Sequence, residues 1–115
     1  MNKLYSIFML LVTGCAGSYP PPSDHLASAV AAARGAQEAG AHQVPRAALQ
    51  LKLAEEQIAQ ARRMMEDGDN ERADYMTLRA YNDAELALAI AREAAARTQA
   101  EQLESAAMNP GQSQQ

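Results

Sequence analysis

The chain has 115 residues, which is enough for one small domain, and it is acidic, with 10 Lys and Arg against 14 Asp and Glu. An acidic chain without a basic block argues against nucleic acid as a partner and is not attracted to anionic lipid surfaces. Alanine supplies 26 residues. Ala together with Glu, Gln and Arg is typical of helices, because these residues lose little side-chain entropy there.

The first residues have the pattern of an export signal. Lys3 precedes an apolar run over residues 4–12, which is too short for a membrane span of about 20 residues. Prolines at 20–22 prevent a helix from simply continuing. The only cysteine, Cys15, has no disulfide partner and needs another explanation. We interpret residues 1–14 as a signal peptide; a buried core segment, or an ordinary signal with the cysteine as a bystander, is the alternative.

The end of this signal, Val12-Thr13-Gly14-Cys15, resembles the lipobox of bacterial lipoproteins. The resemblance implies that Cys15 becomes the first mature residue and carries the lipid, palmitate included, that attaches the chain to the membrane. Ala16 after the cysteine resembles an outer-membrane sorting signal, which implies the outer membrane, facing the periplasm. Residues 15–23 are then the lipidated cysteine and a Pro-rich tether, with a reach of roughly 20–25 Å at about 3.1 Å per residue.

An all-α domain is expected over residues 24–106, because strand-like alternation is lacking. Its three helices are predicted over about 24–39, 45–66 and 70–106. The tail, residues 107–115, reads as disordered.

Short-range signals predict the helix boundaries. Ser23 is expected to cap the first helix. Gly40 and Gly68 are expected to close the first two helices in a left-handed conformation. Pro45 suits the first turn of the second helix, where its missing N–H costs nothing.

The two longer helices carry matching apolar stripes with heptad-like spacing. Folding the chain at Gly68 and Asp69, where Asp69 or Asn70 caps the third helix, brings the stripes into register, because the paired numbers sum to 138. We therefore predict a tight antiparallel helical hairpin, with axes near the lower end of the usual range of about 8–10 Å. The predicted pairs are Met65 with Ala73, Ala61 with Thr77, Ile58 with Ala80, Ala54 with Ala84, Leu51 with Ala87, and Ala47 with Ala91.

Two arrangements of the first helix are open. It can turn back through residues 41–45 and complete a three-helix bundle, or continue the second helix and pair with residues 98–108. Large apolar residues beside the main stripe need a cover, which favours the bundle. These residues are Leu53, Leu78, Tyr81 and Leu88.

No catalytic or metal-binding constellation is recognisable. His25 and His42 lie apart without a nearby His or Cys, whereas a zinc site needs three or four ligands. The acidic turn over residues 66–71 lacks the ligand spacing of a calcium loop. We therefore expect no enzyme, no metal site and no cofactor.

A possible binding face lies on the flank of the hairpin, outside the main stripe. Two tyrosines and a leucine of the third helix accompany Met64 and Leu53 there. Either the first helix covers these side chains or they form a docking patch, since aromatic and Met residues are favoured at interfaces. The candidate binding residues are Arg62, Arg63, Tyr75, Leu78 and Tyr81.

A set of alanines and turn residues is spread over residues 24–100: Gly40-Ala41, Val44-Pro45, Leu49, Leu53-Ala54, Gly68-Asp69, Ala73 and Asp83-Ala84-Glu85-Leu86-Ala87. This pattern resembles a family of small Ala-rich helical bacterial lipoproteins catalogued only as a domain of unknown function. The resemblance implies a location in the cell envelope and supplies no activity.

We expect a lipid-anchored envelope protein that acts as a periplasmic interaction or scaffold module for another envelope protein. The alternative is a structural protein that contacts both the outer membrane and peptidoglycan. Small lipoproteins that are covalently linked to the wall resemble this chain but end in a basic residue. Residues 112–115 are Gln-Ser-Gln-Gln, so only non-covalent contact is expected.

Overall fold

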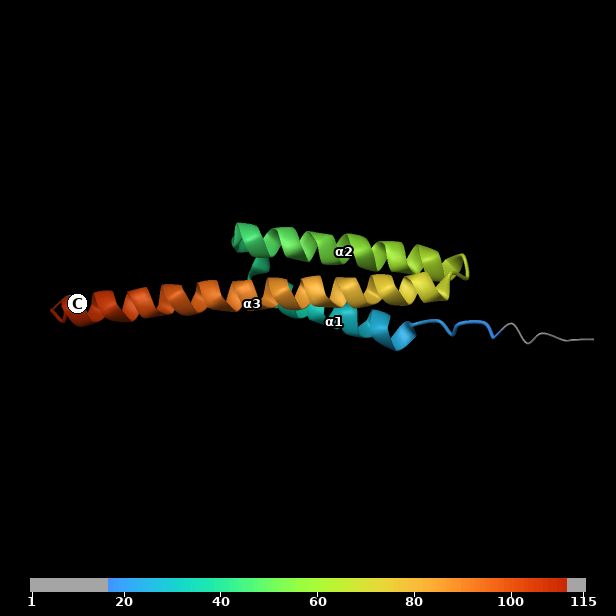
Figure 1. Cartoon of the computed structure of the whole chain (residues 1–115). Helices are drawn as coiled ribbons and strands as arrows, with labels where there is room; N and C mark the ends of the chain where they lie inside the picture. Colours follow the sequence, from blue (N-terminus) through green and yellow to red (C-terminus); the bar gives the residue numbers. More distant parts are fainter. Residues whose placement is uncertain (1–16, 112–115) are drawn as a thin grey trace, which may run out of the picture.

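A computed structural model describes residues 17–111, which form three α-helices and one short 3-10 helix (Figure 1). The expected all-α class is therefore confirmed. The predicted signal peptide and Cys15 lie outside the described residues. The elements are α1 (Ser23–Glu38), η1 (Ala41–Gln43), α2 (Pro45–Glu66) and α3 (Asn70–Met108).

The turn residues behave as predicted. Pro45 is the first residue of α2. Gly40 and Gly68 have φ values of 82° and 78°, in the left-handed region that glycine enters without the steric cost of a Cβ atom. These two positions therefore end α1 and α2 and let the chain reverse.

The two predicted side-chain caps are wrong. Pro22 is the N-cap of α1, and its carbonyl accepts the N–H of Leu26 at 2.9 Å. Ser23 is already the first residue of the helix, and its own N–H donates to the carbonyl of Pro21. Asp69 occupies the N-cap position of α3, but its carboxylate pairs with Arg72 at 3.0 Å and makes no capping bond.

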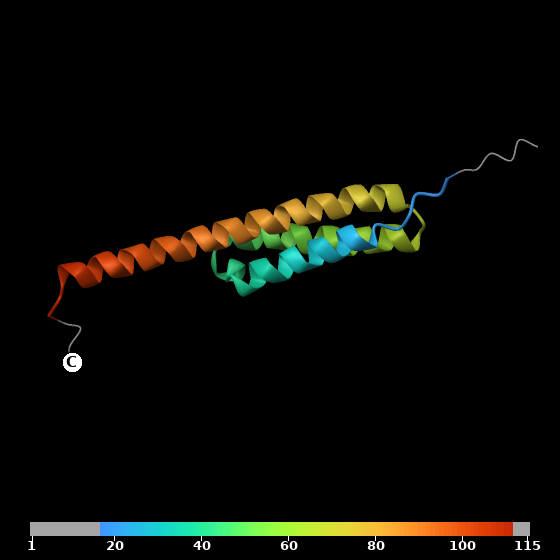
Figure 2. The same cartoon turned by 90° about the horizontal axis from the view of Figure 1, so that it is seen from below.

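The helical hairpin forms as predicted. Helices α2 and α3 lie side by side and run in opposite directions (Figures 1 and 2). Of the twelve stripe residues, all are buried except Met65, which is half-buried. The amide of Gln57 donates to Asp83 at 2.7 Å. Their numbers add up to 140, within two of the predicted 138, so this contact agrees with the predicted register.

Helix α1 packs against the hairpin and completes a three-helix bundle. Its His25 contacts Asp74 and its Gly35 lies beside Leu88, so α1 runs in the same direction as α3. Its buried residues are small, namely Ala29, Ala32, Ala33 and Ala36. The core is therefore largely alanine, and its largest fully buried side chains are Leu51 and Thr77.

One end of α3 lies outside the bundle. The helix has 39 residues against 22 in α2, so it extends past its neighbours (Figures 1 and 2). Every residue from 95 to 108 is exposed. The helix ends at Met108 instead of 106, so the first positions of the predicted tail are helical. Within residues 17–111, no helix combines the length and apolarity needed to cross a bilayer.

Candidate functional site

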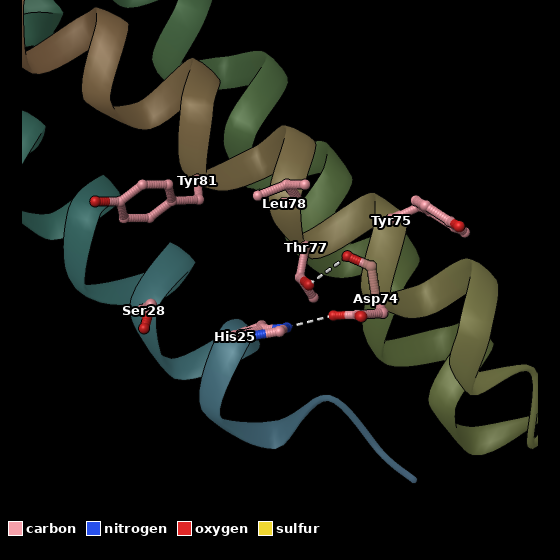
Figure 3. A pocket seen from close by; sticks show the side chains of 7 residues that line it. All are labelled: His25, Ser28, Asp74, Tyr75, Thr77, Leu78 and Tyr81. Carbon is pink, nitrogen blue, oxygen red and sulfur yellow. Dashed lines mark hydrogen bonds and ion pairs between the residues drawn. The ribbon is translucent and has the colours of Figure 1, made fainter. Parts of the chain in front are cut away.

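One concave feature is a groove between α1 and the first half of α3 (Figure 3). Its volume is about 340 Å³, which lies within the range of ligand pockets, about 300–1,000 Å³. One end is polar and the other is apolar. The lining residues are His25, Ser28, Asp74, Tyr75, Thr77, Leu78 and Tyr81.

The structure brings three of the predicted binding residues together in this groove. Tyr75 is 66% exposed, Leu78 57% and Tyr81 38%. Helix α1 therefore does not cover them, because it places alanines in the core and presents the polar His25 and Ser28 to the groove. Contiguous apolar side chains that remain this exposed mark an interaction surface.

The other two large residues beside the stripe, Leu88 and Leu53, differ in burial. Leu88 is half-buried and packs against the core, as expected of a covered residue. Leu53 stays 37% exposed on α2. The bundle thus supplies the predicted cover for only part of this flank.

The two predicted arginines lie away from the tyrosines. Arg62 lines a separate hollow between α1 and α2, together with Val30 and Arg34. Arg63 is exposed in the last turn of α2. Neither arginine lines the groove on α3.

The polar end of the groove is built on Asp74. The Nδ1 atom of His25 donates a short hydrogen bond to Oδ1 of this carboxylate. This bond raises the pKa of His25 above 6.5 and lowers the pKa of Asp74 below 3.8. The side chains are 67% and 21% exposed, so water screens the pair and its contribution to stability is modest.

The end of the Pro-rich segment is held at the same carboxylate. The Tyr19 hydroxyl donates to Oδ2 of Asp74 at 2.5 Å, and this bond raises the pKa of the tyrosine. The side-chain amide of Asn70 donates to the backbone carbonyl of Tyr19 at 2.9 Å. The segment expected to be a free tether is therefore attached to the start of α3 from residue 19 onward.

The groove contains Ser, His and Asp, the residue types of a hydrolytic triad. The Ser28 hydroxyl, however, donates to the backbone carbonyl of Asp24 at 3.0 Å. Thr77 likewise donates to the backbone carbonyl of Asp74 at 2.7 Å. The aliphatic hydroxyls of Ser28 and Thr77 are thus both bonded to their own helices.

No group of three potential metal ligands converges anywhere between residues 17 and 111. His25 has a carboxylate as its partner, whereas His42 lies exposed in η1. The acidic turn is organised by Gly68 and by the pair between Asp69 and Arg72.

No sequence pattern predicts the contacts among Tyr19, His25, Asn70 and Asp74. These residues are 49 to 55 positions apart in the pairs that they form. Periodicity carries no signal for such contacts. The predicted three-helix bundle could have indicated these contacts, because it places the start of α1 beside the start of α3.

Comparison with known proteins gives one family. The family described as "Domain of unknown function (DUF4398)" matches residues 24–103. No curated protein matches, and no solved structure does.

Proposed function

Since this chain belongs to the DUF4398 family, a domain of unknown function, we propose its role from its own geometry: a lipid-anchored periplasmic module for interaction or scaffolding in the cell envelope. The groove lined by Tyr75, Leu78 and Tyr81 is the observation that carries this proposal. Aromatic and leucine side chains with this exposure offer a partner apolar area at low entropic cost, and a rigid helix holds them in place.

The anchoring part of the proposal concerns Cys15. Attachment of the Pro-rich segment at Tyr19 leaves only residues 16–18 between a lipid on Cys15 and the bundle. Fully extended, three residues span about 10 Å. Such a short connection would hold the turn between α2 and α3 close to the membrane surface, with the free end of α3 at the far end of the molecule (Figure 2).

Metabolic labelling with palmitate tests the anchor. The full chain should incorporate label and fractionate with the outer membrane, whereas Cys15→Ser should lose the label and the membrane association. Equal labelling of the two chains would contradict the lipid anchor.

The interaction part requires a comparison of two surfaces. Triple alanine replacement at Tyr75, Leu78 and Tyr81 should abolish the products obtained by crosslinking in cells, as identified by mass spectrometry. A matched triple replacement on the outer face of α2, at Lys52, Glu56 and Gln60, should leave them unchanged. Unchanged products from the groove variant would exclude this groove as the interaction surface.

The free end of α3 favours a second candidate, non-covalent contact between the outer membrane and peptidoglycan. Residues 95–108 are exposed and extend the bundle at the end opposite the Pro-rich segment. Sedimentation of the full chain with purified peptidoglycan separates the two roles. A structural role requires the chain in the pellet; an interaction role leaves it in the supernatant.

A further inference from the structure

The outer face of α3 carries apolar side chains along most of the helix. At 3.6 residues per turn, a set of positions three, four or seven apart lies on one side of the helix, turned away from the buried stripe. Its largest members are exposed: Tyr75 by 66%, Leu78 by 57% and Leu103 by 66%. The positions are 75, 78, 82, 89, 96, 100 and 103, and all of them except Asn82 are apolar.

The two halves of this outer face differ in what surrounds them. The first half borders the groove beside α1, and its Tyr75 and Leu78 line that groove (Figure 3). The second half, residues 95–108, is exposed throughout, and only residues 95–102 border a hollow beside residues 39–44. A partly apolar groove and an exposed helical end thus occur on the same chain.

We infer that two copies pair antiparallel through this face, each laying residues 95–108 along the groove of the other. This inference rests on the proposed function, since it names a second copy as the partner of the same groove. Such a contact is isologous and closes as a two-fold dimer.

The spacing along α3 fits this arrangement. With the two-fold axis at Ala89, positions that meet add up to 178, just as the positions of the α2–α3 hairpin add up to 138. Large side chains then meet small ones except at the ends of the contact, where aromatic and leucine side chains fill the groove. The predicted contacts are Tyr75 with Leu103, Leu78 with Ala100, Asn82 with Ala96, and Ala89 with its own equivalent.

Opposite charges flank the face within two positions of this register, a distance that long side chains can bridge. Glu85 meets Arg92 of the second copy, and symmetry forms this pair twice; both residues are exposed. Arg79 approaches Glu101, and Arg72 approaches Glu104. Glu93 stands opposite Glu85 in this register, but it is already paired with Arg97 of its own chain at 2.6 Å.

The expected contact area is sufficient for a specific dimer. Residues 75–103 span about 43 Å of helix. A strip of this length and about one helix wide buries on the order of 1,000 Å² over both copies, which is the lower limit for a specific interface. A reversible dimer is therefore expected.

A charge reversal tests the register. For the full chain in detergent, sedimentation equilibrium should give a dimer, and Glu85→Arg should raise its dissociation constant about tenfold, since two pairs turn repulsive. The double variant Glu85→Arg with Arg92→Glu should return to within about threefold of the original value. Glu56→Arg on α2 changes the net charge equally and should have no effect. Circular dichroism should show the same helicity in all four chains.

A photo-crosslinking amino acid at position 103 of the full chain tests the contact in cells. It should link to a peptide that contains Tyr75 or Leu78 of a second copy, whereas the same group at position 60 should not. A monomer at all concentrations, a double variant weaker than the single one, or a link from 103 to 103 would overturn the inference. If the chain is monomeric but the triple alanine variant still loses its crosslinks to an envelope protein, the dimer fails and the proposed function stands.

Discussion

The inner and outer faces of α3 reverse the usual relation between residue size and burial. The inner face, packed against α2, consists of Ala73, Thr77, Ala80, Ala84, Ala87 and Ala91, all buried. The outer face carries Tyr75, Leu78 and Leu103, all more than half exposed. Burial on this helix therefore follows from how closely two backbones approach, because only small side chains fit between close axes. The large side chains remain free for contacts outside the bundle.

The largest expected effect concerns the few large residues inside. Leu51 is fully buried, and Leu51→Ala should lower the free energy of unfolding by about 3 kcal/mol, since it leaves a cavity in a thin core. Leu49, two positions earlier, is 56% exposed, so Leu49→Ala should change the free energy of unfolding by less than about 0.5 kcal/mol. Urea unfolding followed by circular dichroism measures both. Similar losses from both variants would contradict the assigned core.

Adding volume sharpens the comparison between the faces. Ala84→Leu should lower the free energy of unfolding by about 2 kcal/mol, because the facing backbone leaves no room for the side chain. Ala89→Leu makes the same change on the exposed outer face, and it should shift the free energy of unfolding by less than about 0.5 kcal/mol. If Ala84→Leu were tolerated equally well, the close approach of α2 and α3 would be wrong.

Removing a large residue from the outer face should scarcely alter the fold. Leu78 is 57% exposed, so Leu78→Ala should change the free energy of unfolding by less than about 0.5 kcal/mol, at a protein concentration low enough to separate copies. A loss comparable to that of Leu51→Ala would mean that this face is part of the core.

The smallest effect is expected at the polar end of the groove. Asp74→Asn should lower the pKa of His25 back toward 6.5, because the hydrogen bond to the carboxylate is the main cause of the raised value. Asp24→Asn should lower it less, since Asp24 makes the smallest contribution. NMR titration of the His25 ring measures both. An unchanged pKa in Asp74→Asn would contradict the pair.

The sign of the pH dependence follows from the two shifts. The raised pKa of His25 means that its contribution to stability is complete below about 6.5 and is lost as pH rises through the folded-state value. The lowered pKa of Asp74 means that its contribution is present above about 3.8 and is lost as pH falls through its folded-state value. The pair therefore stabilises the start of α1 most between these two values.

Much of the fold could be predicted because local signals and the apolar period agreed. Pro45 and Gly68 mark where α2 begins and where the chain turns after it, and the stripes of α2 and α3 match only when the chain folds at that turn. The caps could not be predicted in the same way. Which residue becomes the N-cap depends on where the chain leaves the Pro-rich segment, and Asp69 had a competing partner in Arg72.

Less of the candidate site could be predicted. The tyrosines and Leu78 were identified as residues outside the stripe, but their exposure depended on how α1 packs. Arg62 was selected on the polar face of α2, and a helix face alone does not show which groove it borders. The contacts of Tyr19 and His25 with Asp74 join distant segments, so they follow from the tertiary structure only.

Attachment of Tyr19 to α3 has a mechanical consequence. A pull on residue 17 runs along the long axis of the bundle and first loads the bonds from Tyr19 to Asn70 and Asp74. Once these bonds open, the force acts on α1 parallel to the neighbouring helices. All alanine contacts of α1 then bear the load at the same time, whereas a force across the helix would detach α1 one turn after another. The force needed to detach α1 from its N-terminal end should therefore be higher than expected for the turn-by-turn detachment of a helix of only 16 residues.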